Sequence, residues 1–342
     1  MSGVRLQDVA DLAGVSMKTV SNVVRGYKHV SASTRERVQR AIDELDYRPN
    51  LMGRRLATGR TGLISLSFSN VGIPYFAELS RLVSASASKL GYRVLLDETD
   101  GTLEGERAVL ENSESGLVDG MLFQPAAVSA MEIIRRRSAL PVVILGEAPA
   151  PLTLDRVMVD NFAAARDATR HLIETGRRRV AFTGHEAGKL SAASSQRILG
   201  YQQALEDAGV PAEPQLLLPR DTVTAMGAVV GVGSALDAGV RFDGLVCRDD
   251  LAAIGALRAL QERGIRVPQD VALTGWDNIM MSRVTYPSIT SIAPDMSALA
   301  HRATEMLVER IEGFEGVGRH ELVSHRLVLR ESAPAAARVL SG

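Results

Sequence analysis

The chain has 342 residues, of which 46% are hydrophobic and 23% are charged, and its formal net charge is −1. This length allows two or three domains, and the composition is that of an ordinary soluble globular protein. No apolar run approaches the length of a membrane span and the N-terminal segment lacks the basic-then-apolar layout of a secretion signal, so we expect a cytoplasmic protein. The single cysteine, Cys247, excludes an internal disulfide, and the six histidines lack metal-ligand spacing. We expect no metal and no cofactor.

The near-neutral total conceals a basic N-terminal segment. Through Arg60 the chain carries 11 Lys or Arg residues and 6 Asp or Glu residues, a net charge of +5, whereas the remainder carries 28 against 34, a net charge of −6. A basic head on an acidic body favours a polyanionic partner that binds through one end only.

Residues 6–24 predict two short amphipathic helices separated at Gly14. Their apolar positions are Leu6, Val9, Ala10 and Ala13, then Val15, Val20, Val23 and Val24. The residues expected to face outward are Ser16, Met17, Lys18, Thr19, Ser21 and Asn22. A second helix with exposed hydrogen-bonding side chains in its first turn is what a helix-turn-helix protein places in the DNA major groove. The alternative is a small helical hairpin without that role.

A third helix is expected next, capped by Ser33 or Thr34, with an inward stripe of Val38, Ala41, Ile42 and Leu45. Residues 1–47 should therefore form an all-α helix-turn-helix domain. Residues 48–60 are expected to be a hinge, because the segment after Pro49 is too short and too rich in Arg and Gly to be a stable helix alone. On DNA, Leu56 could enter a minor-groove base step while Arg54 and Arg55 meet phosphates. The alternative is a plain interdomain linker.

From Thr61 onward, short apolar segments alternate with helical ones, which predicts an α/β core of two doubly wound lobes. A ligand site is expected where the strand ends of the two lobes face each other. We expect Ser288–Ile292 to return the chain to the first lobe and Leu322–Leu329 to supply a last strand. The predicted division is 61–160 with 291–321 for the first lobe, 161–290 with 322–331 for the second, and a flexible tail at 332–342.

Ordered motifs in the head are shared with a known family. They are Asp8-Val9-Ala10, Ala13-Gly14-Val15-Ser16, Thr19-Val20-Ser21, Val30-Ser31, Thr34-Arg35, Tyr47-Arg48-Pro49-Asn50 and Leu56-Ala57. They resemble the head of the lactose/galactose repressor family of bacterial transcription regulators. The resemblance implies that Met17, Lys18 and Asn22 read bases, that Ser16, Thr19 and Ser21 contact phosphates or cap the helix, and that Asn50, Arg54, Arg55 and Leu56 form the DNA-binding hinge.

Two positions depart from that pattern. Asn22 stands where many members have arginine, so the preferred operator should differ. Gly53 replaces the usual alanine and should raise the free energy of hinge-helix formation by roughly 1 kcal/mol.

The core resembles the family's periplasmic-binding-protein-like domain. The resemblance implies effector contacts from Asn70, Tyr75, Phe76, Asp160, Arg197, Asp249, Trp276 and Asp277. Three of these residues have a second interpretation. Arg197 is either a ligand contact or a surface arginine near a helix start, Trp276 either stacks on the ligand or fills the edge of the lobe, and Asp160 either contacts the ligand or caps the helix that begins at Asn161.

The function implied by this resemblance is that of a homodimeric repressor that binds a palindromic DNA operator and responds to a small molecule. Sugars are the favoured effectors and nucleosides remain possible, and the sequence leaves induction and corepression open. One rival class is a ligand-binding protein whose head mediates assembly. The other is an enzyme on a two-lobed core, and because the sequence has no nucleophile elbow, phosphate-binding loop or dinucleotide fingerprint, we do not expect an enzyme.

Overall fold

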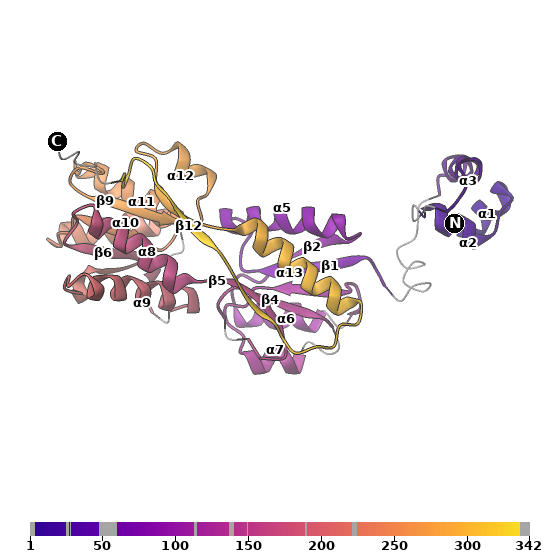
Figure 1. Cartoon of the computed structure of the whole chain (residues 1–342), viewed down its shortest axis with the longest axis horizontal. Helices are drawn as coiled ribbons and strands as arrows, with labels where there is room; N and C mark the ends of the chain where they lie inside the picture. Colours follow the sequence, from indigo (N-terminus) through magenta and orange to yellow (C-terminus); the bar gives the residue numbers. More distant parts are fainter. Residues whose placement is uncertain are drawn as a thin grey trace, which may run out of the picture. The chain divides into compact units, whose positions relative to one another are not determined.

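The computed structural model describes residues 4–24, 27, 29–47, 60–112, 115–136, 140–148, 150–188, 190–220 and 224–335. The chain divides into two compact units, Met1–Gly62 and Leu63–Gly342 (Figure 1). The hinge residues predicted at Asn50, Arg54, Arg55 and Leu56 lie outside the described residues.

The described part of the first unit contains three helices, α1 (Leu6–Ala13), α2 (Met17–Val24) and α3 (Ala32–Glu44). Gly14 ends α1 in the left-handed conformation, with φ 63°, and so turns the chain into α2. The small core is made by Val9, Ala10, Ala13, Val20, Val23, Val38 and Ala41. The helix-turn-helix prediction is confirmed in this unit.

Two details of this unit differ from the sequence prediction. Ser31, not Ser33 or Thr34, caps α3, because its Oγ accepts a hydrogen bond from Thr34 N at 3.3 Å. Val24 is 40% exposed rather than buried, since it ends α2 beyond the reach of the other two helices.

The second unit contains two six-stranded sheets. In spatial order the first sheet consists of β11 (His320–Val323), β5 (Asp155–Val159), β4 (Val142–Leu145), β3 (Gly120–Phe123), β1 (Leu63–Phe68) and β2 (Arg93–Glu98), all parallel. The second consists of β12 (His325–Val328), β10 (Thr290–Pro294), β9 (Ala272–Trp276), β8 (Gly244–Cys247), β6 (Val180–Glu186) and β7 (Leu217–Arg220). Only the β10–β12 pair among these strands is antiparallel. The central strands are buried on both faces, as helices covering a parallel sheet require.

Helices cover both faces of each sheet, so the predicted pair of doubly wound lobes is confirmed (Figure 1). On the first sheet, α5 (Pro74–Lys89) and α13 (Met296–Ile311) cover one face, and α6 (Leu103–Asn112) and α7 (Ala130–Arg136) cover the other. On the second, α10 (Ala225–Asp237) and α11 (Asp250–Glu262) pack together, as do α8 (Asn161–Glu174) and α9 (Ala192–Asp207). A short helix, α12 (Met280–Val284), follows β9, and a 3-10 turn, η2 (Pro214–Leu216), precedes β7.

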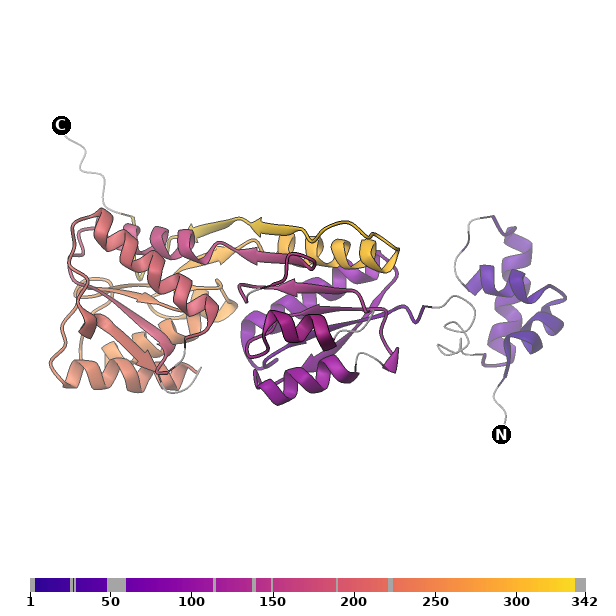
Figure 2. The same cartoon turned by 90° about the horizontal axis from the view of Figure 1, so that it is seen from below.

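The chain passes between the lobes after β5, after β10 and between β11 and β12 (Figure 2). The strand expected at Ser288–Ile292 is β10, and it belongs to the second sheet, where Ser291 pairs with Gly275 of β9. The single strand expected at Leu322–Leu329 is instead divided between the two sheets as β11 and β12. Sequence pattern could not assign β10 to a sheet, because a strand buried on both faces reads the same in either lobe.

The beginning of the expected flexible tail is part of the fold. Ser332 and Ala333 are fully buried. Ser332 Oγ donates to Leu273 O at 2.7 Å and accepts from Thr290 N at 2.9 Å. The sequence did not predict that this segment is buried, because its residues are polar or small. Hydrogen bonds, and not an apolar pattern, hold it in place.

Candidate nucleic-acid interface and ligand site

The outward face of α2 carries the residues predicted to read DNA bases. Met17 is 49% exposed, Lys18 is exposed and Asn22 is half-buried, while Val20 and Val23 of the same helix face the core. Within the described residues, the side chains of Met17, Lys18 and Asn22 make no hydrogen bond. They are therefore available to an external partner.

The polar residues that flank the predicted base-reading positions also stabilise α2. Ser16 Oγ accepts from Thr19 N at 3.2 Å and lies 2.9 Å from Thr19 Oγ1, so Ser16 caps α2. Ser21 is half-buried, on the side of the helix between the core and the open face. Tyr27, 54% exposed and edge-on to the His29 ring at 5.6 Å, adds an aromatic side chain that the sequence prediction did not include.

A second group of polar residues lies where strands of both lobes end. We call it the interlobe cluster and define it as Tyr75, Glu147, Asn161, Arg197, Arg248, Asp249 and Asp277. Tyr75 is the second residue of α5, Glu147 follows β4, Arg248 and Asp249 follow β8, and Asp277 follows β9. The carboxyl ends of parallel strands are where open α/β sheets bind ligands.

Arg197 connects the members of the interlobe cluster. Its Nε donates to Asn161 Oδ1 at 2.6 Å and its Nη1 donates to the backbone oxygen of Arg248. The guanidinium lies over the Trp276 ring, 3.8 Å from the centroid. Burial lowers the pKa of Arg197, and the carboxylates of Asp277 and Glu147 oppose that effect. These contacts fix the guanidinium of Arg197 in place. Its third nitrogen, Nη2, makes no hydrogen bond to the described residues.

Asp277 and Tyr75 also have unfilled hydrogen-bonding capacity. Within the described residues, neither the Asp277 carboxylate nor the Tyr75 hydroxyl makes a hydrogen bond. Burial raises the pKa of Asp277 to about 6, with Arg197 opposing and Asp249 adding to the rise. Burial also raises the pKa of Tyr75, followed by the charges of Glu147 and Asp277. The Asp277 carboxylate, the Tyr75 hydroxyl and Arg197 Nη2 thus lie near one another. They offer an acceptor, a group that can donate or accept, and a donor.

Both carboxylate oxygens of Asp249 already bond within the protein. Its Oδ1 accepts from Ala252 N at 2.7 Å and so caps α11, while Oδ2 lies 2.7 Å from Arg248 Nη1. Arg248 also faces Glu186 at 3.6 Å, and burial is the largest influence on its pKa, which the carboxylates raise overall. This ion-paired group stiffens the start of α11 beside Asp277.

Four of the predicted effector residues have partners within the protein. Asp160 caps α8, because its Oδ1 accepts from Ala163 N at 2.8 Å. Asn70 is exposed and closes its own turn on Gly72 N at 2.7 Å. Phe76 is buried and stacks on Phe68 with ring centroids 5.0 Å apart. Trp276 is 2% exposed, so it supports Arg197 and presents no open face for stacking.

The sequence prediction missed Glu147, Asn161 and Arg248. Asn161 is fully buried and donates through Nδ2 to Glu147 Oε1, which links a first-lobe loop to the start of α8. Glu147 is the first carboxylate after β4, and Arg248 directly follows β8. Charged residues at the ends of buried strands were the available signal.

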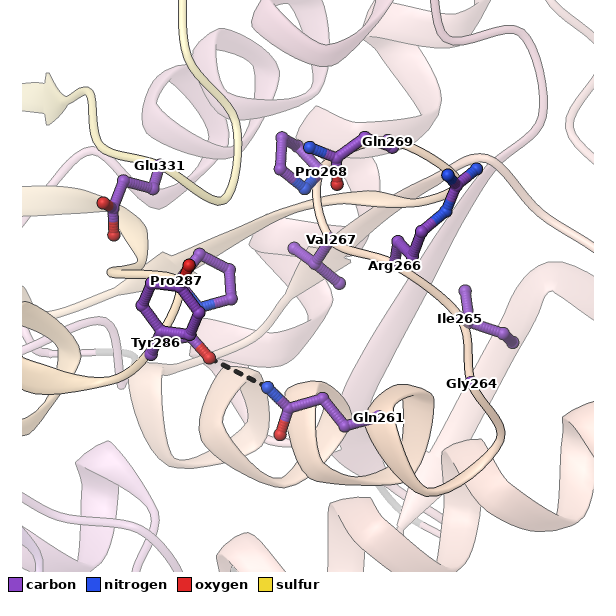
Figure 3. Close-up of a pocket in the computed structure, with 10 residues that line it drawn as sticks. All are labelled: Gln261, Gly264, Ile265, Arg266, Val267, Pro268, Gln269, Tyr286, Pro287 and Glu331. Carbon is purple, nitrogen blue, oxygen red and sulfur yellow. Dashed lines mark hydrogen bonds between the residues drawn. The ribbon is translucent and has the colours of Figure 1, made fainter.

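A separate pocket of about 510 Å³ lies at the opposite, amino-terminal edge of the second sheet (Figure 3). It is formed by the segments that lead into β9 and β10, with Gln261 and Glu331 beside them. Gln261 Nε2 donates to Tyr286 O at 2.8 Å, Glu331 accepts from Ser288 N at 2.7 Å, and Arg266 pairs with Asp270 at 2.6 Å. Gln261, Arg266 and Glu331 of this pocket thus already bond within the protein, whereas Asp277 and the Tyr75 hydroxyl of the interlobe cluster make no hydrogen bond to the described residues.

Two further features are absent from the part of the chain that the structure describes. No group of three or more His, Cys, Asp or Glu side chains there is arranged to hold a metal ion. None of the described helices combines the length and apolarity needed to cross a membrane.

Comparison with known proteins agrees with both parts of the molecule. Residues 5–50 match the model of bacterial regulatory proteins of the lacI family, and residues 169–333 match a periplasmic binding protein-like domain. The chain is 30% identical over 330 residues to the HTH-type transcriptional repressor PurR of Aliivibrio fischeri, covering 96% of this chain and 97% of that protein.

Two solved structures are similar over almost the whole chain. The transcriptional regulator CelR in complex with cellobiose is 30% identical, with a TM-score of 0.72, covering 96% of this chain and 99% of that one. The Lac repressor dimer bound to operator and an anti-inducer is 25% identical, with a TM-score of 0.84, covering 98% of this chain and 100% of that one. The chain belongs to the lacI family of bacterial regulatory proteins.

Proposed function

We propose that this DNA-binding transcription regulator is a homodimeric repressor that reads a palindromic operator through α2 and releases or grips it according to a neutral sugar at the interlobe cluster. The observation that carries the proposal is the open face of α2, where Met17 and Lys18 are exposed on a helix of the lacI-family head. Unpartnered side chains in the first turn of a recognition helix are placed to reach base edges in the major groove.

The chemistry of the interlobe cluster supports a polyhydroxyl ligand. Asp277 can accept from ligand hydroxyls, Arg197 Nη2 can donate to them, and Tyr75 can do either. Arg248 is paired with Asp249 and Glu186, so within the interlobe cluster Glu147 and Asp277 share the Arg197 guanidinium. An extra anionic group would meet that excess of carboxylates, so we favour neutral sugars over phosphorylated ones. The cellobiose complex of CelR adds a precedent for a sugar in a similar chain.

Exposed apolar surface supports pairing of two copies. In the second lobe, Met280, Met281, Val284 and Tyr286 are between 57% and 87% exposed on and after α12. In the first lobe, the edge strand β2 exposes Leu95 and Leu96 at 39% and 44%. Figure 1 shows α5, β2 and α12 along the same side of the second unit. The similar Lac repressor is a dimer on its operator, and contiguous exposed apolar residues mark association sites.

The test is a binding measurement in two stages. Palindromic duplexes selected from a random library are titrated with the purified protein by fluorescence anisotropy, at two salt concentrations and with Lys18→Ala alongside. The selected duplex is then titrated in the presence of cellobiose, glucose, ribose and glucose 6-phosphate. We expect tight binding that weakens steeply with salt and changes with a neutral sugar. Absence of duplex binding by a folded dimer would favour a ligand-binding protein with an assembly head, and turnover of a sugar would favour an enzyme.

A further inference from the structure

Asp250 is a fully buried carboxylate directly behind the interlobe cluster. It is the first residue of α11, and its Oδ2 accepts from Ile279 N at 2.8 Å while its Oδ1 accepts from Ser291 Oγ at 2.7 Å. Gly275 makes room for it, because a Cβ at that position would lie 2.1 Å from Asp250 Oδ1. Three separate elements, α11, β9 and β10, therefore meet on this one side chain.

These contacts surround an unusual turn. Asp277 and Asn278 both have left-handed backbones, with φ of 90° and 53°. Asn278 N donates to Ser291 Oγ at 3.0 Å, and Ser291 Oγ donates onward to Asp250. Two consecutive non-glycine residues in this region persist only where surrounding groups hold them. Asp250 and Ser291 bind the two amide groups that follow Asp277, which fixes the direction of the Asp277 side chain.

We propose that Asp250 is a positioning residue, which holds the left-handed turn at Asp277 and Asn278 through Ser291 and Ile279 and so aims the Asp277 carboxylate into the interlobe cluster. The inference rests on the proposed function only in naming Asp277 as a ligand contact. The turn can be measured without any ligand, so failure of the sugar proposal and failure of this one are distinguishable.

The charge state of Asp250 indicates which substitution is conservative. Burial and the Asp277 charge raise its pKa to about 7, against the hydrogen bonds from Ser291, Ile279 and Ser282. Arg330, whose pKa burial lowers, also faces it, and Asp249 precedes it on α11. A side chain that is partly neutral at physiological pH can be replaced by an amide. In Asp250→Asn, the amide oxygen can accept from Ile279 N and the amide nitrogen can donate to Ser291 Oγ.

The experiment is hydrogen exchange by mass spectrometry on the full chain without ligand. Asp250→Ala should speed exchange in residues 277–283 at least tenfold and shift the emission of Trp276, the only tryptophan, to longer wavelength. Asp250→Asn should stay within threefold of the wild type. Ser291→Ala removes the link to Asn278 N and the hydrogen bond to Asp250 Oδ1 but keeps the bond from Ile279 N to Asp250. It should give an intermediate increase, and it serves if Asp250→Ala does not fold.

The matched control is Asp243→Ala at the opposite edge of the same sheet, where Asp243 accepts from Arg178 N and Arg179 N at 3.1 and 2.9 Å. Its effect should be confined to residues 177–181. Unchanged exchange at 277–283 in Asp250→Ala, or a uniform increase over the whole lobe, would overturn the proposal. Exchange in Asp250→Asn as fast as in Asp250→Ala would overturn it as well.

Discussion

The outward face of α2 and the interlobe cluster differ in how their polar side chains are held. On α2, Met17 and Lys18 stand exposed without partners, above a core of only a few small apolar residues. In the interlobe cluster, Arg197 is held by Asn161, the backbone of Arg248 and the Trp276 ring. In our proposal, the first surface leaves its side chains free to contact duplex DNA, whereas the second is preorganised for a small ligand.

Arg197→Ala should have the largest effect on ligand binding at the interlobe cluster. It removes a charge-assisted donor and the clamp on Asn161, so the affinity for the sugar found in the panel should fall by about 100-fold, or roughly 3 kcal/mol. Calorimetric titration measures the loss. Arg197→Lys, which keeps the charge but not the planar fork, should recover only part of the affinity. Operator binding without sugar should remain, and a parallel loss of both would mean that the substitution damages the whole unit.

Lys18→Ala tests the exposed region. Removal of one cation from the reading helix should weaken operator binding by about tenfold, close to 1.4 kcal/mol, and lessen its salt dependence. Anisotropy titrations at several salt concentrations give both quantities. Arg241→Ala, which removes one positive charge from an exposed position before β8, is the control and should change neither. Equal effects of the two substitutions would indicate that only overall charge matters.

The pH dependence of sugar binding sharpens the comparison. The pKa of Asp277 is raised to about 6 in the free protein. Hydroxyl donors from a sugar bind the ionised carboxylate, so affinity should rise several-fold between about pH 5 and pH 7 and level off above that range. Titrations across this range, with Asp277→Asn as the pH-insensitive reference, measure the effect. A profile of wild type that stays flat, or that falls with rising pH, would contradict this role of Asp277.

The smallest expected effect concerns the scaffold of the head. Ser31→Ala removes the cap of α3 and should lower the stability of the first unit by about 1 kcal/mol. Ser33→Ala, at an exposed position inside α3, should change it by much less. Hydrogen exchange of residues 32–38 follows both. The reverse order of effects would support the cap expected from sequence over the one in the structure.

The elements of the fold were predictable because they depend on local pattern. Helical spacing identified α1 and α2, and apolar strand segments identified both lobes. Sheet membership of β10 and the burial of Ser332 depend on partners distant in sequence, which periodicity does not encode. In the candidate site, Arg197 and Asp277 were predicted from the family resemblance. Asn161 and Glu147 did not, because their roles come from a contact between the two lobes.

The central claim is that DNA binding by α2 depends on a small molecule held by Arg197 and Asp277 in the other unit. The most direct test is operator anisotropy with and without saturating sugar, on wild type and Asp277→Ala. We predict that the sugar changes the wild-type dissociation constant at least fivefold and leaves that of Asp277→Ala unchanged, while both bind equally without sugar. An equal sugar response in both proteins would contradict the claim.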